Sequence, residues 1–586
     1  MSDLLIRLRL FVKKWNYILT AEHKKKSVIV FIAILLSSLF ELLGISMIIP
    51  FVTLLVDRTG IHSNTFLMGI IDRLGIDIDD NSIVLPMAIA VIAIFVFKDM
   101  FLILTEYLSL RYENRIQKDF CVFMINAYLQ RPYEDTLDVN SAEVMRGIGN
   151  DVTALYYIIQ AFFSLFTGVI TVILVGLFLV KADHIMAISL VIIVGGLSGL
   201  ILLALKGHVK RFGIVFNESM VESNKHALQA LNGLKEILVL NRRSSFVKRY
   251  EDAVEKQRKA QLRYRFLQSL PRYVIETVFI CGIIAFVSFR VIKGMDVVAF
   301  MPVLSAFAIA SVRLLPLVNQ ISTSSTTILY YMPSFENAYA NIKKSREYLS
   351  EIDQEKDKAI LEYNEEIAIN NVSWKYKRAE EPTFRDVNIR IKKGEAIGIK
   401  GPSGAGKTTL ADVILGLLPP ASGNIEIDGV DLANCKDSWS KLIGYVPQNV
   451  YLLDDTIRNN ILFGISEEEY SEARVLEAIN EACLSDFIKS LPDGLDTVVG
   501  ERGTKLSGGQ RQRIAIARVL YYNPQIIVLD EATSALDTDT EIAVMEAIER
   551  LQGQKTLIII AHRLSTLAKC DRVFEVKDGK VEESKL

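Results

Sequence analysis

The chain has 586 residues and a formal net charge of −2, from 66 Lys and Arg against 68 Asp and Glu. Hydrophobic residues make up 51% of it, which excludes the disordered and fibrous classes, and the charge balance argues against a general nucleic-acid-binding protein. The halves differ, because residues 1–345 carry 36 basic and 27 acidic side chains (36 − 27 = +9) and residues 346–586 carry 30 and 41 (30 − 41 = −11).

The first half reads as a membrane domain. Residues 4–20 mix Leu, Ile, Phe and Trp with cations, which predicts a helix in the cytoplasmic membrane interface within an N-terminal segment 1–26. Six apolar runs follow, each about as long as a helix needs to cross the hydrocarbon layer. These runs cover 27–56, 83–110, 155–180, 185–206, 273–292 and 296–320. We therefore expect an α-helical transmembrane domain with six crossings over residues 27–345.

The distribution of cations predicts the orientation of this domain. Lys and Arg are frequent before the first crossing and in the loops near 111–152 and 207–272, and sparse in the other loops. Both chain termini should therefore be cytoplasmic. The first apolar run is too long for a signal peptide. The long outer loop 57–82 has helical spacing of apolar residues, so it is either a short external amphipathic helix or a solvated loop.

The two halves should join in a charged segment. The cytoplasmic loops carry apolar residues every three or four positions, so we expect the membrane helices to continue well into the cytoplasm. Residues 346–364 are charged and are predicted to be a linker, followed by a second domain over 365–586. The five cysteines form no CxxC pair and fit no zinc spacing, which favours buried thiols in a reducing compartment.

The first motif in the second half is a phosphate-binding loop. Residues 395–400 (EAIGIK) predict a short strand, and GPSGAGKTTL follows it before an apolar helical run. This is GxxxxGK[ST] in a strand–loop–helix context, where backbone N–H groups and a helix N-terminus surround phosphate oxygens. Lys407 is expected to reach the β- and γ-phosphates and Thr408 to bind Mg²⁺. The predicted ATP-binding residues here are Gly401, Pro402, Ser403, Gly404, Ala405, Gly406, Lys407, Thr408 and Thr409.

Two further motifs follow the loop. The apolar strand IIVLDE, residues 526–531, ends in two carboxylates, of which Asp530 is expected to hold the Mg²⁺ shell and Glu531 to polarise the attacking water. The turn LSGGQ, residues 506–510, precedes a helix and supplies a second phosphate-binding turn through Ser507, Gly508, Gly509 and Gln510.

These motifs, in this order and spacing, resemble the nucleotide-binding domain of the ATP-binding cassette (ABC) superfamily over about residues 365–586. The resemblance implies roles for further positions. Tyr376 would stack on adenine, Gln448 in GYVPQN would contact Mg²⁺ and water, and His562 in IIIAHRLST would contact the γ-phosphate. The catalytic set is thus Glu531, His562 and Gln448, the metal set is Thr408, Gln448 and Asp530, and SALD at 534–537 resembles the D-loop.

The resemblance also implies a partner. In the family, the LSGGQ turn of a second domain covers the γ-phosphate bound at a P-loop, so ATP lies between two domains. One complete motif set in this chain, with both Glu531 and His562 present, favours a homodimer with two competent ATP and Mg²⁺ sites.

Fusion of six crossings ahead of the cassette resembles an exporter half-transporter, the type I exporter (type IV ABC) fold. VGERG at 499–503 resembles the exporter X-loop, whose Glu501 and Arg502 would touch intracellular tips near 131–140 and 240–246. ATP would close the cassettes and open the cavity outward, and hydrolysis would reset it.

The substrate is a separate question. ELLGISMIIPF and the loop after it are similar to bacterial lipid-linked oligosaccharide flippases of the inner membrane, which implies outward movement of a polyprenyl-pyrophosphate glycan. Lys98, Arg272 and Arg313 are the candidates for binding its pyrophosphate. The alternatives are intramembrane pairing with acidic neighbours, or snorkelling, which is favoured for Arg272. An exporter of peptides, drugs or other lipids and an ATP-gated channel or regulator remain as competing functions.

Overall fold

The structure is a computed structural model. It describes residues 2–47, 51, 84–137, 140–182, 184–292, 297–354, 361–377, 379–466, 468–531, 538–561 and 563–585. The outer loop 57–82, the SALD segment and His562 lie outside these residues. The chain divides into two compact units, one of residues 1–130 and 139–348 and one of residues 131–138 and 349–586, and each is described by itself.

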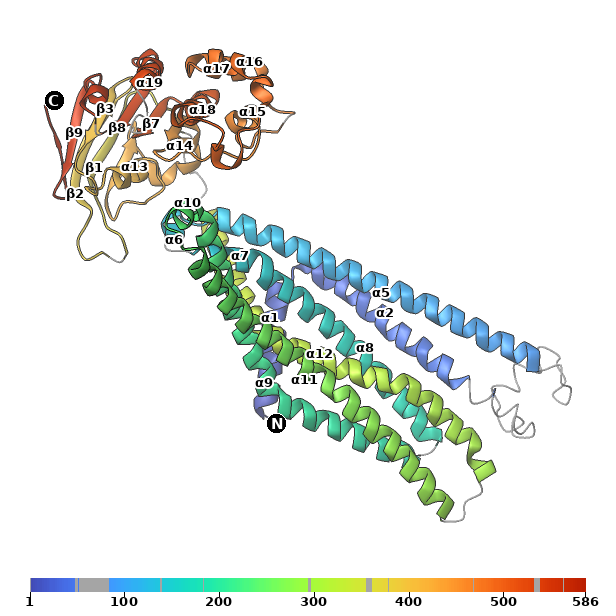
Figure 1. Cartoon of the computed structure of the whole chain (residues 1–586). Coiled ribbons are helices and arrows are strands. Elements are labelled where there is room, and N and C mark those ends of the chain that lie inside the picture. The colour runs from blue at the N-terminus through green and yellow to red at the C-terminus, as the bar shows by residue number, and fades with distance from the viewer. Residues whose placement is uncertain are drawn as a thin grey trace. The chain divides into compact units, whose positions relative to one another are not determined.

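The first unit is helical, with six long helices that run alongside one another (Figure 1). Four stretches of the described residues are long and apolar enough to cross a membrane: 21–46, 84–129, 141–181 and 243–289. The two other predicted runs, 185–206 and 296–320, fall on the remaining long helices. The helices are α1 (Ser2–Ile18), α2 (Ala21–Ser46), α5 (Val84–Leu129), α7 (Ser141–Met145), α8 (Val152–Ala182), α9 (His184–Asn232), α10 (Leu234–Val239), α11 (Arg243–Ile292) and α12 (Val297–Gln354).

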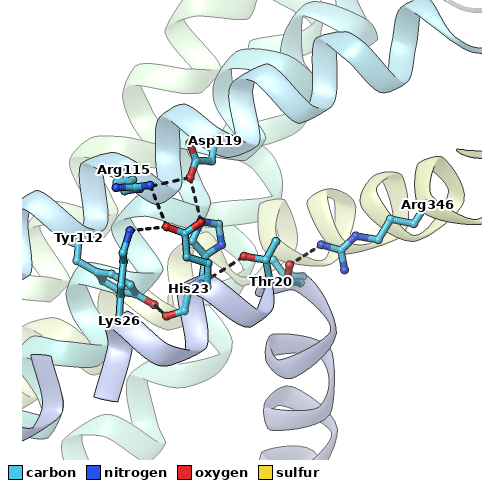
Figure 2. Close-up of polar contacts among 9 residues, drawn as sticks. Thr20, His23, Lys26, Tyr112, Arg115, Asp119 and Arg346 are labelled. Atoms are coloured by element: carbon cyan, nitrogen blue, oxygen red, sulfur yellow. Dashed lines mark hydrogen bonds and ion pairs between the residues drawn. The ribbon is translucent and has the colours of Figure 1, made fainter. Parts of the chain in front are cut away.

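A polar cluster fixes the corner between α1 and α2, as Figure 2 shows. Thr20 caps α2 by accepting a hydrogen bond from the His23 backbone, and His23 Nε2 lies 3.0 Å from Asp119 on α5. Arg115 bonds Glu22 at 2.9 Å. Because α1 also packs Phe11 and Trp15 against Phe335 of α12, the predicted interfacial helix is part of the helical core.

The second unit holds two sheets. A six-stranded sheet has the order β10-β9-β3-β8-β7-β6, in which all neighbours are parallel except β10 and β9. An antiparallel sheet has the order β2-β1-β4-β5. The strands are β1 (Glu366–Trp374), β2 (Phe384–Lys392), β3 (Ala396–Lys400), β4 (Ser422–Ile427), β5 (Val430–Asp431), β6 (Ile443–Val446), β7 (Ile526–Asp530), β8 (Thr556–Ile560), β9 (Arg572–Lys577) and β10 (Lys580–Glu583).

Two apolar cores hold this unit together. One lies between the two sheets and includes residues of α13 and α14, and the other packs α15 to α20 on the parallel sheet. β3, β7 and β8 are almost wholly buried, as expected for parallel strands covered on both faces. The helices are α6 (Tyr133–Leu137), α13 (Lys407–Ile414), α14 (Lys436–Leu442), α15 (Ile457–Leu462), α16 (Glu472–Glu481), α17 (Ser485–Ser490), α18 (Gly508–Tyr521), α19 (Thr538–Leu551) and α20 (Leu564–Leu567). The predicted fold class, a helical membrane domain followed by an α/β P-loop domain, is confirmed.

Candidate nucleotide-binding site

The parallel sheet gathers the predicted site residues at one edge. The P-loop follows β3, Gln448 follows β6, and Asp530 and Glu531 stand at the end of β7. Since the carboxyl ends of parallel strands meet at one edge, these segments converge although they lie up to 130 residues apart. His562 follows β8, which lies between β3 and β7 in the sheet.

The P-loop needs glycine where it bends. Gly401 has a φ of 154°, and a Cβ added there would lie 2.3 Å from the carbonyl oxygen of Val576. Gly406 has a φ of 100°, and its Cβ would lie 2.6 Å from Thr383. Only glycine permits both the backbone conformation and this close approach. The loop therefore keeps its N–H groups free of side-chain bulk ahead of α13.

Lys407 is buried at the start of α13. Its Nζ donates hydrogen bonds to the backbone oxygens of Gly401 (3.1 Å) and Pro402 (3.0 Å). Burial lowers the pKa of Lys407, while the nearby Glu531 and Asp530 oppose that shift. The Lys407 ammonium is thus bonded to the backbone of its own loop and lies near Asp530 and Glu531.

Asp530 is 2% exposed at the end of β7. Burial raises its pKa, and hydrogen bonds from Thr408 and Tyr445 oppose that shift. Its Oδ1 atom is buried and has no hydrogen-bond partner among the described residues. Glu531 has a φ of 48°, and its side chain accepts a hydrogen bond from Gln448 Nε2. Four of the predicted catalytic and metal residues are therefore in contact in pairs: Thr408 with Asp530, and Gln448 with Glu531.

The predicted adenine-stacking residue lies beside the P-loop helix. Tyr376 is 40% exposed and packs edge-on against Trp374 at 4.3 Å between ring centroids. Its hydroxyl lies 3.0 Å from Thr409 Oγ1 on α13. This places an accessible aromatic face next to the phosphate loop.

The LSGGQ turn forms a helix N-terminus. Ser507 caps α18 in a capping box, in which its Oγ accepts from the Gln510 N–H at 3.2 Å and its own N–H donates to Gln510 Oε1 at 2.8 Å. Gly508 and Gly509 open the helix, and Ser507 is exposed. No described contact joins this turn to the P-loop of the same chain.

Sequence reasoning missed two residues of the site. Tyr445 precedes Gln448 by three positions, and its hydroxyl bonds Asp530. Asp412 lies on α13, where burial, with Asp530 nearby, raises its pKa to about 6. Tyr445 lies within GYVPQN but carries no role there, and Asp412 belongs to no motif, so only the packing around β7 could reveal them.

The predicted substrate residues are not brought together by any described contact. Lys98 on α5 is 2% exposed, lies 3.1 Å from Asp99 Oδ1 and stands over the Phe95 ring. This arrangement favours the pairing alternative for Lys98. Arg272 on α11 is exposed, and the side chain of Arg313 lies outside the described part of α12.

Comparisons with known proteins agree with this geometry. A family model described as ABC transporter matches residues 384–534. The ATP-dependent lipid A-core flippase of Yersinia pestis bv. Antiqua (strain Antiqua) is 32% identical over 422 residues, 70% of each chain. That of Photorhabdus laumondii subsp. laumondii is 31% identical over 423 residues, again 70% of each.

Among solved structures, a bacterial Atm1-family ABC exporter with ATP bound superposes with a TM-score of 0.72. The match covers 96% of this chain and 95% of that one at 23% identity. This likeness extends over both units and establishes the fold.

Proposed function

The chain belongs to the ABC transporter family and is an integral membrane ATPase coupled to transport, and from this premise we propose that it is a lipid flippase. Its substrate class is an anionic lipid, specifically a glycan linked to polyprenyl pyrophosphate, moved from the cytoplasmic to the outer leaflet. The observation that carries the proposal is the relationship to lipid A-core flippases. The nucleotide unit from residue 365 has only 222 residues (586 − 364), so about 200 of the 422 aligned residues lie outside it.

A cavity in the membrane unit supports a lipid-like substrate. It measures about 290 Å³, lies between α8, α9, α11 and α12, and is lined almost wholly by apolar side chains. Gly176, Gly195 and Gly199 border it, and a Cβ added at any of them would meet no atom within 4 Å. The one hydroxyl in the lining, Ser198, is bonded to the Val194 carbonyl at 2.7 Å. Such a cavity suits hydrocarbon and offers nothing to a charged peptide.

ATP would bind with its adenine on Tyr376 and its phosphates in the loop 401–406. Lys407 would exchange the carbonyls of Gly401 and Pro402 for phosphate oxygens, since charge-assisted bonds to phosphate are the stronger ones. Glu531 and Gln448 would position the attacking water, with His562 on the γ-phosphate. Because phosphoryl transfer depends mainly on positioning and charge, this set needs no covalent intermediate.

The residues present fit a magnesium ion. The unpartnered buried Oδ1 of Asp530 and the hydroxyl of Thr408 are hard oxygen donors on neighbouring elements, which is the chemistry that Mg²⁺ prefers. Mg²⁺ would neutralise charge that develops on the phosphates. The hydroxyl of Tyr445 would help to orient the carboxylate of Asp530.

A homodimer completes each site. Ser507 at the start of α18 is exposed, and no contact among the residues that the structure describes joins this helix N-terminus to the P-loop. A second copy would place that N-terminus on the γ-phosphate. In this arrangement both termini are cytoplasmic and the membrane is the bacterial inner membrane.

Reconstitution into liposomes tests the proposed function. Full-length protein would receive a fluorescent lipid-linked glycan, the fluorescent lipid without glycan, or a fluorescent soluble peptide, with ATP outside. We expect ATP-dependent movement of the lipid-linked glycan, and none with Glu531→Gln. Transport of the lipid alone would shift the substrate class to another lipid, and transport of peptide alone would reject the flippase.

A further inference from the structure

A cationic cleft lies on the cytoplasmic extensions of α9 and α11. The two helices run side by side (Figure 1) and share a small core of Val209 and Tyr264. Beside this core the structure holds a cleft of about 430 Å³ with an apolar floor of Phe212, Val215 and Ala260. Its basic residues are His208, Arg211, Lys256, Lys259 and Arg263, all exposed. This cleft belongs neither to the nucleotide site nor to the substrate residues predicted from sequence.

Some of the basic side chains along the cleft form ion pairs with carboxylates and others do not. Lys256 lies 3.2 Å from Glu222 and Lys259 lies 3.5 Å from Glu255, so the far end is paired with carboxylates. Arg211 and Arg263 form no ion pair with any described residue. The guanidinium groups without an ion pair are therefore at one end of the cleft, which Arg211, Arg263 and His208 line.

That end is the one nearer the membrane. The apolar run of α9 ends near residue 206, and Arg211 follows five residues later, or about 8 Å along the helix. The apolar run of α11 begins near residue 273, and Arg263 precedes it by ten residues, or about 15 Å. The headgroup layer extends roughly 5–8 Å beyond the hydrocarbon on each side. Arg211 thus lies at the outer edge of the headgroup layer, and the cleft continues from there past Arg263 into the cytoplasm.

We propose that the cleft binds the phosphate-bearing headgroup of an anionic lipid in the cytoplasmic leaflet before translocation. The proposal rests on the proposed flippase function and names the place where the substrate is first recognised. Arginine forks bind phosphate oxygens in pairs, and the apolar floor accommodates the less polar face of an attached sugar. A soluble phosphate compound would not require a site at this level, so the position favours a lipid.

Two matched variants test the cleft. Arg211→Gln/Arg263→Gln removes the uncompensated cations, and Lys235→Gln/Lys248→Gln removes two exposed cations on the same helical hairpin outside the cleft. The probe is a synthetic diphosphorylated glycolipid in phosphatidylcholine nanodiscs, with the dephosphorylated lipid and inorganic pyrophosphate as separate arms. The readouts are the Kd for each probe and the half-saturating lipid concentration for ATPase stimulation.

We expect the cleft variant to raise the Kd for the diphosphorylated glycolipid by roughly fivefold per cation removed. Basal ATPase should stay at the wild-type rate, and the control variant should bind normally. The difference between the two variants should shrink at high salt. Equal Kd values for the two variants, equal binding of the dephosphorylated lipid, or competition by pyrophosphate at the lipid's own Kd would each overturn the proposal.

The outcomes separate this site from the proposed function. If wild-type protein transports the lipid-linked glycan and the cleft variant has an unchanged half-saturating lipid concentration, the site fails and the flippase stands. If the glycolipid binds the cleft but no lipid is transported, the flippase fails and the site stands. An unchanged basal ATPase rate shows that both variants are folded.

Discussion

At the scale of single residues, the proposed site centres on one buried carboxylate. The hydroxyls of Thr408 and Tyr445 lower the pKa of Asp530, and its Oδ1 atom is buried without a hydrogen-bond partner among the described residues. Leaving a buried acceptor unpaired costs free energy, which supports the proposal that Oδ1 of Asp530 binds a cation during turnover.

Removing the hydroxyl of Tyr445 should loosen Asp530 without removing a metal ligand. For Tyr445→Phe we expect the half-saturating Mg²⁺ concentration of the ATPase to rise about tenfold, as is typical when a partner of a metal ligand is lost. Titration of Mg²⁺ at saturating ATP measures this value. Tyr451→Phe, at an exposed tyrosine, is the control. An unchanged Mg²⁺ requirement would mean that Tyr445 only fills space.

Glu531→Gln should separate ATP binding from hydrolysis. The amide keeps the shape of the side chain but cannot polarise water, so the ATPase rate should fall at least about a hundredfold. ATP binding, measured with a fluorescent analogue, should remain. A variant that still hydrolyses ATP at a substantial rate would place the catalytic base elsewhere.

The ionisation of Asp412 should make the stability of the folded protein depend on pH. Its pKa is raised from 3.8 to about 6, so the folded protein holds this proton more tightly than the unfolded chain does. Stability is therefore lost as pH rises from about 4 to 6, and the full cost is present above that range. Asp412→Asn removes this cost, which we put at about 1 kcal/mol after allowance for solvent screening.

The thermal midpoint in detergent checks the prediction for Asp412→Asn. It should exceed the wild-type midpoint at pH 7.5, by a difference that disappears near pH 4. The exposed Asp486→Asn should change the midpoint at neither pH. A gain that is the same at both pH values would contradict the ionisation argument.

At the scale of elements, α6 connects the membrane helices to the nucleotide unit. It follows α5 after three residues, yet it packs in the second unit. Lys377, next to Tyr376, lies 2.8 Å from Asp135 and 3.5 Å from Glu134, and these carboxylates raise its pKa. The segment that would contact adenine is therefore bonded to α6 within the second unit, and α6 follows the membrane helix α5 in the chain.

Charge reversal tests this connection. Lys377→Glu should reduce lipid-stimulated ATPase about two- to fivefold, the range expected from losing an exposed ion pair, while basal ATPase changes less. Combining it with Asp135→Lys should restore stimulation, because the pair is rebuilt with opposite signs. Lys392→Glu, on β2, is the control. Failure of the double variant to recover would show that Lys377 acts without Asp135.

At the scale of the whole molecule, the proposed dimer makes a prediction about nucleotide dependence. Ser403→Cys and Lys505→Cys place thiols beside the P-loop and the LSGGQ turn. In a Glu531→Gln background, a short bis-maleimide should crosslink two chains when ATP is present. Without ATP, few crosslinked pairs of chains should form. Lys489→Cys, on α17, replaces Lys505→Cys in the control. Crosslinking that does not depend on ATP, or that forms within one chain, would contradict a dimer in which ATP lies between the P-loop of one chain and the LSGGQ turn of the other.

The sequence by itself determined the division into a helical membrane half and an α/β half, and the identity of the P-loop, Asp530, Glu531, Gln448 and the LSGGQ turn. Those features are local: a run of apolar residues fixes a crossing, and a short motif fixes a phosphate loop. The structure confirms the fold class they predict. The roles assigned to all the site residues, including Tyr376 and His562, stay predictions, as does the dimer.

Only the tertiary structure decided which distant residues meet. Tyr445 reaches Asp530 because β6 and β7 are neighbours in the sheet, and α6 reaches Lys377 across more than 200 residues of chain. Arg211 and Arg263 border one cleft because α9 and α11 pack side by side. Each is a contact between elements, which the spacing within either element does not encode, since packing depends on shape and burial over the whole chain.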